Sequence, residues 1–189
     1  METIEIIAVV FGLICVWLTV RQNIWCWPTG LVMVSLYIFI FLEAKLYSDM
    51  LLQVIYVGLQ FYGWHAWLYG GPDRSQLSVS RLAGRDVATW LAVCAAGTLA
   101  LGGFMSHSTD ASFPFPDAFT TTASLIAQWL MGRKKLESWL VWITVDVVSI
   151  ALYSAKELYL TAGLYAVFLG LATLGFFEWR KTLQAPALA

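Results

Sequence analysis

Seven long apolar segments occupy most of this 189-residue chain. They cover residues 4–20, 28–42, 47–69, 87–105, 119–131, 139–153 and 158–177. About 20 apolar residues are needed for a helix to cross roughly 30 Å of hydrocarbon, so the shorter segments must use flanking residues. Only 12% of the residues are charged, where a soluble domain has roughly a quarter. The sequence therefore predicts an integral membrane protein.

The basic residues predict how the segments cross the membrane. Unpaired backbone groups are not tolerated in lipid and the alternating pattern of a membrane strand is absent, so each segment is expected to be an α-helix. Seven crossings place the termini on opposite sides. Lys45 and Lys156 lie on the side of the N-terminus, and the other nine basic residues lie on the opposite side. The positive-inside rule then predicts a cytoplasmic C-terminus and an N-terminus outside.

The chain also repeats itself at an offset of 112 residues. The matched pairs that are not merely aliphatic are Trp17 with Trp129, Arg21 with Arg133, Trp27 with Trp139, Tyr47 with Tyr159, Gly58 with Gly170, Gly63 with Gly175 and Trp67 with Trp179. Because the segment at 87–105 is a single crossing, the two halves would keep the same orientation. The predicted fold is all-α, with two parallel three-helix repeats joined by a linker helix.

The expected division of the chain follows from this repeat. Residues 1–69 form the first three-helix repeat, and residues 70–116 hold a cytoplasmic loop, the linker helix and an outer loop. Residues 117–181 form the second repeat, and residues 182–189 form a short cytoplasmic tail. Parallel repeats of this kind occur in transporters that bind their substrate at mid-membrane between the halves.

The sixth segment carries a polar and aromatic stripe. Trp139, Trp142, Asp146 and Ser149 recur at spacings of three or four, which places them on one helix face. Asp146 lies near the middle of the membrane, where a carboxylate is costly and is by default a candidate for a functional site. The alternative is that Asp146 only hydrogen-bonds hydroxyl groups of neighbouring helices.

Amides form a second set of candidates. Gln53, Tyr56, Gln60 and Trp64 share a stripe of the segment 47–69, and Gln128 stands alone in the fifth segment. Such amides either bind a ligand or hold helices together, and both readings stay open. A cavity that combines a carboxylate, amides and indole rings would suit a flat cationic solute, because the rings offer stacking and cation–π attraction.

Other classes of function find little support in the sequence. The net charge is −1 and the basic residues form no patch, so nucleic-acid binding is not expected. The three cysteines lack metal-site spacing, and neither a metal nor a cofactor is predicted. There is no P-loop, HExxH or GxSxG motif, which disfavours ATP drive and an intramembrane enzyme. A retinal photoreceptor is disfavoured because residues 158–177 contain no Lys. The fifth helix is expected to open with Thr120, Thr121, Thr122 and Ser124 on the outer side, where their hydroxyls either cap the helix, which is the expected role, or line an entrance.

Several short motifs together resemble the PnuC family of bacterial vitamin transporters. They are WPTG at 27–30, LYSD at 46–49 followed by Gln53 and Gln60, YGWHAW at 62–67, WLVWITVD at 139–146, KELY at 156–159 and GFFEW at 175–179. Each motif alone is weak, but together they cover nearly the whole chain.

This resemblance implies a fold similar to a full-length SWEET transporter, assembled as a homotrimer in the bacterial inner membrane. It implies uptake of nicotinamide riboside by uniport, with a cytoplasmic kinase trapping the product, while relatives carry thiamine or riboflavin. Polar residues and the WxxW pattern of that family map onto Trp139, Trp142, Asp146, Gln53 and Gln60. The family commonly has an amide at the position of Asp146, and coupling to protons through this residue stays open.

Overall fold

The chain folds into seven long helices in a computed structural model that describes residues 2–43, 45, 47–109 and 112–184. The helices are α1 (Glu2–Val20), α2 (Cys26–Glu43), α3 (Tyr47–Tyr69), α4 (Gly84–Ser108), α5 (Pro114–Gly132), α6 (Glu137–Ala155) and α7 (Tyr159–Gln184), with a short 3₁₀ turn η1 (Pro72–Arg74). Across these described ranges no strand is formed, and the predicted all-helical fold is confirmed. Leu46 and the end of the predicted tail, residues 185–189, lie outside the described residues.

The three apolar segments that are too short to cross the membrane by themselves are lengthened by the residues that flank them. α2 has 18 residues, and α5 and α6 have 19 each. α5 gains its first turn from Pro114, which suits a first helical position because its missing N–H would have had no partner. At a rise of 1.5 Å per residue, each helix reaches roughly 27 to 29 Å, enough for the hydrocarbon layer.

Among the residues that the structure describes, five helices are both long and apolar enough to cross a membrane: α1, α2, α4, α6 and α7. The helices α3 and α5 carry more polar side chains. Gln53 and Gln60 lie in α3, while α5 contains three consecutive Thr from Thr120 and then Gln128. The polar side chains of these two helices are among the candidates for binding.

The start of α5 corrects one prediction. Thr120 and Ser124 lie inside the helix, where their hydroxyls donate to the carbonyl oxygens of Asp117 and Thr121 at 2.9 and 3.0 Å. The expected capping role is wrong, because the helix begins at Pro114, six residues before Thr120. The apolar pattern starts late here, since the first turns of α5 contain Pro and Asp.

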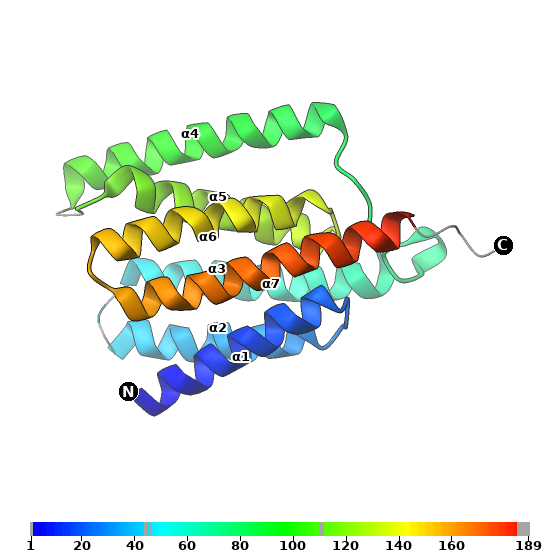
Figure 1. The fold of residues 1–189 in the computed structure, drawn as a ribbon, viewed down its shortest axis with the longest axis horizontal. Helices are drawn as coiled ribbons and strands as arrows, with labels where there is room; N and C mark the ends of the chain where they lie inside the picture. The colour runs from blue at the N-terminus through cyan, green and yellow to red at the C-terminus, as the bar shows by residue number, and fades with distance from the viewer. Residues whose placement is uncertain (1, 44, 46, 110–111, 185–189) are drawn as a thin grey trace. The chain divides into compact units, whose positions relative to one another are not determined.

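The chain divides into two compact units, and each is described by itself. Unit 1 comprises residues 1–78 together with Gly132–Lys134, and unit 2 comprises residues 79–131 and 135–189. In unit 1, α2 packs against both α1 and α3 (Figure 1). Two glycines permit close approach there: a Cβ at Gly30 would collide with the Gln60 amide, and one at Gly63 would collide with the Trp27 ring.

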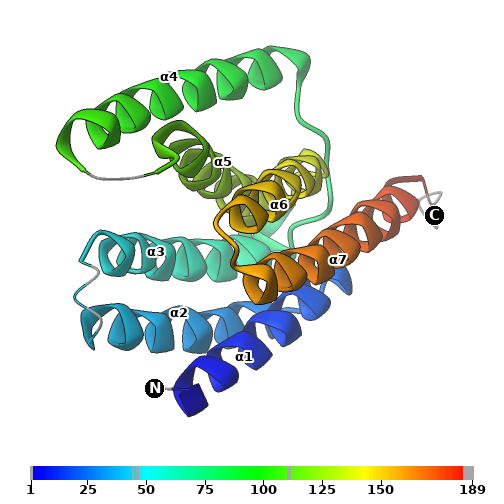
Figure 2. The same cartoon turned by 60° about the vertical axis from the view of Figure 1, so that its left-hand side comes forward.

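Unit 2 contains the remaining four helices. α6 and α7 form a packed antiparallel pair, and a Cβ at Gly175 in α7 would meet the Trp139 ring of α6. α4 runs beside α5 (Figure 2). Gly97 and Gly102 of α4 face Thr122 and Phe115 of α5, where added Cβ atoms would collide with those side chains.

Local geometry recurs at the offset of 112 residues. The bounds of α5 are those of α1 moved by that offset, and the left-handed residues Gln22 and Lys45 correspond to Lys134 and Glu157. Such backbone conformations are uncommon for residues other than glycine, so this agreement is informative. The parallel placement of the two repeats and the proposed division of the chain into domains stay predictions.

Candidate functional site

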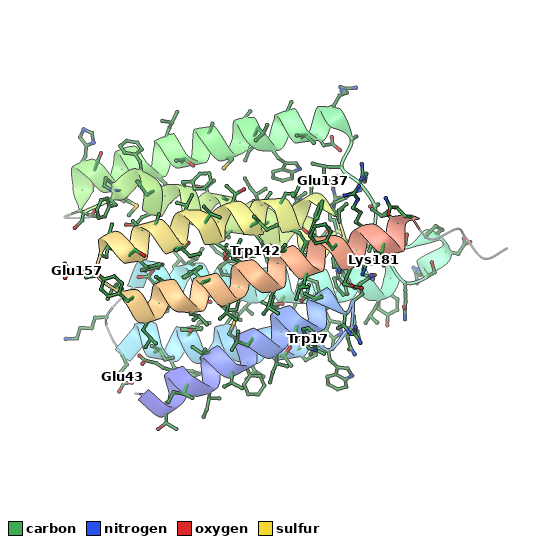
Figure 3. All side chains as sticks on the ribbon, in the orientation of Figure 1. Trp17, Glu43, Glu137, Trp142, Glu157 and Lys181 are labelled. Atoms are coloured by element: carbon green, nitrogen blue, oxygen red, sulfur yellow. The ribbon has the colours of Figure 1, made fainter. Side chains whose placement is uncertain are left out.

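The stripe of α6 is largely withdrawn from solvent. Asp146, Ser149 and Trp139 are 3%, 2% and 2% exposed, and Trp142 is half-buried. Asp146 is the tenth of the 19 residues of α6. By helical rise it lies roughly 14 Å from either end, so a spanning α6 would hold it close to mid-membrane. Figure 3 labels Trp142 on the same helix, which begins at the labelled Glu137.

The Asp146 carboxyl has no partner within the described residues. Neither a hydrogen bond nor an ion pair reaches it there, and the nearby hydroxyl of Thr144 donates instead to the Leu140 carbonyl oxygen at 2.9 Å. Inside hydrocarbon, an ionised carboxylate costs roughly 3 kcal/mol or more, and a polar group without a hydrogen bond is also costly. Within the described residues, Asp146 therefore makes no hydrogen bond to a hydroxyl group that would explain it as a purely structural contact between helices.

The two tryptophans of the WxxW motif have different surroundings. The Trp139 ring meets the Trp179 ring edge-on, with centroids 5.4 Å apart, and it also covers Gly175. Its indole Nε1 is buried without an acceptor among the described residues. Trp142 has no such ring contact within those same ranges and keeps part of its surface open. Trp142 is therefore the indole that can stack on a ligand, whereas Trp139 mainly packs α6 against α7.

Unit 1 also holds a buried polar side chain in a helix, that of Gln60. Its side chain is 5% exposed and lies against Gly30, and its Oε1 has no donor among the residues that the structure describes. A Cβ at Gly30 would also come within 3.0 Å of the Cys15 Sγ atom. Gly30 thus makes room for an amide whose carbonyl oxygen can still accept a hydrogen bond.

The remaining predicted site residues are less enclosed. Gln53, Tyr56 and Trp64 are half-buried along α3, and Gln128 is half-buried on α5. The structure therefore gathers Gln53, Tyr56, Gln60 and Trp64 on one helix of unit 1. It gathers Trp139, Trp142, Asp146 and Ser149 on one helix of unit 2. That both sets line one pocket stays a prediction.

Lys134 has a role that the sequence did not reveal. Its side chain is 7% exposed, its Nζ donates to the Leu77 carbonyl oxygen at 2.9 Å, and it lies 4.4 Å from the Trp67 ring centroid. Desolvation by burial lowers the pKa of the Lys134 ammonium from its ordinary value. In the sequence it is the middle of three consecutive basic residues, and nothing in that run distinguishes a buried cation from a solvated one.

The described part of the chain contains no candidate metal site, because no three His, Cys, Asp or Glu side chains lie close enough together there to hold a metal ion. An open depression is lined by His65, Tyr69 and Arg74 at the end of α3. It shares no residue with the two stripes. The stripes themselves offer what a flat cation needs, namely a carboxyl, an amide oxygen and an indole face.

Comparison with known proteins identifies the family of the chain. The family model described as "Nicotinamide mononucleotide transporter" matches residues 2–181. The nicotinamide riboside transporter PnuC of Escherichia coli strain K12 is 27% identical over 93% of this chain and 84% of its own length. The PnuC of Neisseria mucosa is 29% identical over 94% of this chain and 72% of its own length.

Two further comparisons bear on substrate and fold. The riboflavin/roseoflavin transporter RibM of Streptomyces davaonensis is 25% identical over 93% of this chain and 83% of its own length. A solved structure described as the crystal structure of the vitamin B3 transporter PnuC superposes with a TM-score of 0.77 and 26% identity. That superposition covers 97% of this chain and 83% of the other.

Proposed function

This chain belongs to the nicotinamide mononucleotide transporter family, and from that premise we propose that it carries nicotinamide riboside into the cell. Its relatives and its helical fold make it a multi-pass membrane transporter of a small molecule. Nicotinamide riboside contains a flat pyridinium ring with a fixed positive charge and a carboxamide. Each of these groups has a complement among the buried side chains.

The observation that carries the proposal is the partnerless Asp146 carboxyl inside α6. A carboxylate beside the pyridinium would be neutralised by it, and the half-buried Trp142 one turn away offers a ring for stacking. Gln60 would accept a hydrogen bond at its free Oε1, for which the substrate carboxamide and ribose hydroxyls are suitable donors.

Transport proceeds downhill in this proposal. The sequence has no P-loop for ATP, so the substrate gradient supplies the driving force. Phosphorylation of the substrate by a cytoplasmic kinase adds negative charge and traps it inside. The protein works in the bacterial inner membrane as a homotrimer, with its N-terminus outside and its C-terminus in the cytoplasm.

Uptake of radiolabelled nicotinamide riboside by liposomes that contain the purified full-length protein tests the function. With equal pH on both sides of the membrane, we expect accumulation to the external concentration without ATP, and loss of most of this uptake in Trp142→Ala. The exposed acid Asp86 gives a matched control, since Asp86→Asn should transport normally. Uptake no faster than in empty liposomes would overturn the proposal.

The riboflavin/roseoflavin transporter among the relatives supports a second candidate substrate. Thiamine, which carries a cationic thiazolium, is a third. Thermal-shift measurements with the three vitamins at equal concentration separate these candidates, because the ligand with the lowest Kd stabilises the folded protein most. We expect nicotinamide riboside to give the largest shift; a larger shift with riboflavin would move the assignment to that vitamin.

The assembly and orientation need separate measurements. Mass determination of the detergent-solubilised protein distinguishes a trimer from a monomer. Reporter fusions at each terminus, active on only one side of the membrane, test the predicted orientation. A cytoplasmic N-terminal reporter would contradict it, because the nine basic residues on the C-terminal side predict the reverse.

A further inference from the structure

Asp146 stands at the middle of its helix, and no Lys or Arg of the chain stands at the middle of a described helix. The 11 Lys and Arg residues all lie in loops or in the first or last five residues of a helix. The nearest along α6 is its C-cap residue Lys156, ten residues from Asp146, and its ammonium is held by the Asp117 carboxylate at 3.0 Å. No lysine or arginine could therefore neutralise Asp146 from the interior of any helix, whichever helices face it.

The other titratable groups near the level of Asp146 do not supply a cation either. Within unit 2, α5 has none between Ala118 and Met131, α7 has none between Ala166 and Phe177, and α4 has only Cys94 between Val87 and Met105. Tyr153 and Tyr165 stack on each other near the C-terminal end of α6, seven residues from Asp146. Within α1, α2 and α3 of unit 1, the titratable groups away from the helix ends are Cys15, Tyr37, Tyr56 and Tyr62. The others lie in the first or last five residues of a helix, namely Glu2, Glu5, Cys26, Glu43, Tyr47, Asp49, Tyr69 and the exposed His65.

An ionised Asp146 would thus be a bare negative charge in the interior of the protein. Such a group avoids the cost of desolvation by keeping its proton, unless a cation arrives beside it. A pyridinium ring brings that cation with a charge that it cannot lose. The carboxyl can then ionise, because the two charges neutralise each other in the buried site.

We propose that the empty transporter holds a proton on Asp146 and that binding of a cationic substrate releases this proton to water. The inference rests on the proposed function and specifies its chemistry. The O–H bond of the carboxyl breaks, the proton goes to the solvent, and the carboxylate pairs with the substrate cation. The site is electrically neutral before and after binding.

Proton release when the substrate binds, and proton uptake when the substrate leaves, then become steps of the transport cycle. The substrate enters with its charge balanced by the carboxylate, and Asp146 takes a proton on the inner side when the substrate leaves. The empty site returns neutral. One proton moves outward for each substrate that moves inward, so the step moves no net charge. The uniport of the proposed function thereby becomes an exchange, in which a pH difference across the membrane adds to or opposes the substrate gradient.

Titration calorimetry of the full-length protein in detergent tests the inference. Nicotinamide riboside is titrated at one pH in two buffers that differ in ionisation enthalpy, and the difference in heat gives the number of protons released. We expect a value near one for the native protein and near zero for Asp146→Asn, which keeps the shape of the side chain. Asp86→Asn should behave as the native protein does.

A second measurement varies the ligand instead of the protein. Reduced nicotinamide riboside has an uncharged dihydropyridine ring, and its binding should release no proton. The affinity for the oxidised cation should also rise about tenfold for each unit of pH while Asp146 is protonated in the empty protein. Binding of the cation with no proton release, or equal release from native protein and Asp146→Asn, would overturn the inference.

The same titrations separate this inference from the proposed function. Release of one proton on binding thiamine, with no binding of nicotinamide riboside, would uphold the role of Asp146 and overturn the proposed substrate. Binding of nicotinamide riboside without proton release would leave the proposed substrate standing and overturn the exchange. Absence of binding by either cation would overturn both.

Discussion

Trp27 and Trp139 have the same environment in two different helix pairs. Trp27 meets Trp67 edge-on with ring centroids 5.3 Å apart, and Trp139 meets Trp179 at 5.4 Å, with interplanar angles of 85° and 86°. Both indole Nε1 atoms are buried without an acceptor in the described part of the chain. Each ring also covers a glycine of the neighbouring helix, so each helix pair is built around one glycine and one indole.

Substitution of these two glycines should destabilise the protein. A Cβ at Gly63 would collide with the Trp27 ring, and one at Gly175 would lie 2.5 Å from the Trp139 ring. We expect Gly63→Ala and Gly175→Ala each to lower the free energy of unfolding by about 1–3 kcal/mol, as overpacked cores do. The measurement is the thermal midpoint in detergent, followed by tryptophan fluorescence.

Two other glycines provide matched controls for this prediction. Gly58 and Gly170 stand five residues earlier in the same helices, and a Cβ at either would meet nothing within 4 Å. Alanine there should leave stability unchanged or raise it by up to about 1 kcal/mol, because glycine is unfavourable inside a helix. Equal losses at all four positions would show that the indole contacts are not the cause.

Lys134 should make stability depend on pH. Burial lowers its pKa in the folded protein, so in the range between that lowered value and about 10.5 the unfolded chain binds more protons. Stability then rises with pH across this range and falls as pH drops through it. We expect the thermal midpoint of the native protein to rise relative to that of Lys134→Met as the pH increases toward about 10.5.

The exposed Lys45 supplies the control for this pH experiment. Lys45→Met should follow the native protein at every pH. Lys134→Met also loses the hydrogen bond to Leu77 and the contact with the Trp67 ring, which separately lowers its stability. A difference between native protein and Lys134→Met that stays constant with pH would contradict the assigned titration.

The ion pair of Asp117 and Lys156 should contribute more than a surface pair. Both side chains are about a quarter exposed, and Lys156 Nζ donates to the two carboxylate oxygens at 3.0 Å each. Asp117→Asn should cost about 1 kcal/mol, whereas Glu178→Gln in the more exposed pair with Lys181 should cost about 0.3 kcal/mol or less. Denaturation in low and high salt checks the first value. Restoration of stability by the charge exchange Asp117→Lys with Lys156→Asp would support a direct pair.

The number and positions of the helices followed from the sequence because hydrocarbon permits few alternatives. The segment 47–69 has both ends as predicted. α1 begins two residues before its predicted segment, whereas α7 continues seven residues past the predicted end at residue 177. The start of α5 was placed five residues late, because Pro114 and Asp117 interrupt the apolar pattern although they suit a first helical turn.

The sequence predicts the candidate site only in part. Periodicity placed Asp146 and Ser149 on one face, and the structure finds both buried. Periodicity could not distinguish Trp139 from Trp142, because the partners of Trp139 are Gly175 and Trp179, more than 30 residues away in the chain. Nor could it show that Lys134 turns inward, since that depends on the left-handed backbone at this residue and on the Leu77 carbonyl.

The two tryptophans of α6 should therefore respond differently to truncation. Trp139→Ala removes the ring that Trp179 and Gly175 contact, and should lower the free energy of unfolding by about 3–5 kcal/mol. Trp142→Ala removes a half-buried ring and should weaken nicotinamide riboside binding about tenfold or more, with a smaller change in stability. Calorimetry and thermal midpoints of both variants separate the two effects. The exposed Trp25 serves as control, since Trp25→Ala should change neither quantity. Normal affinity in Trp142→Ala would remove this indole from the binding site and leave Asp146 to be tested alone.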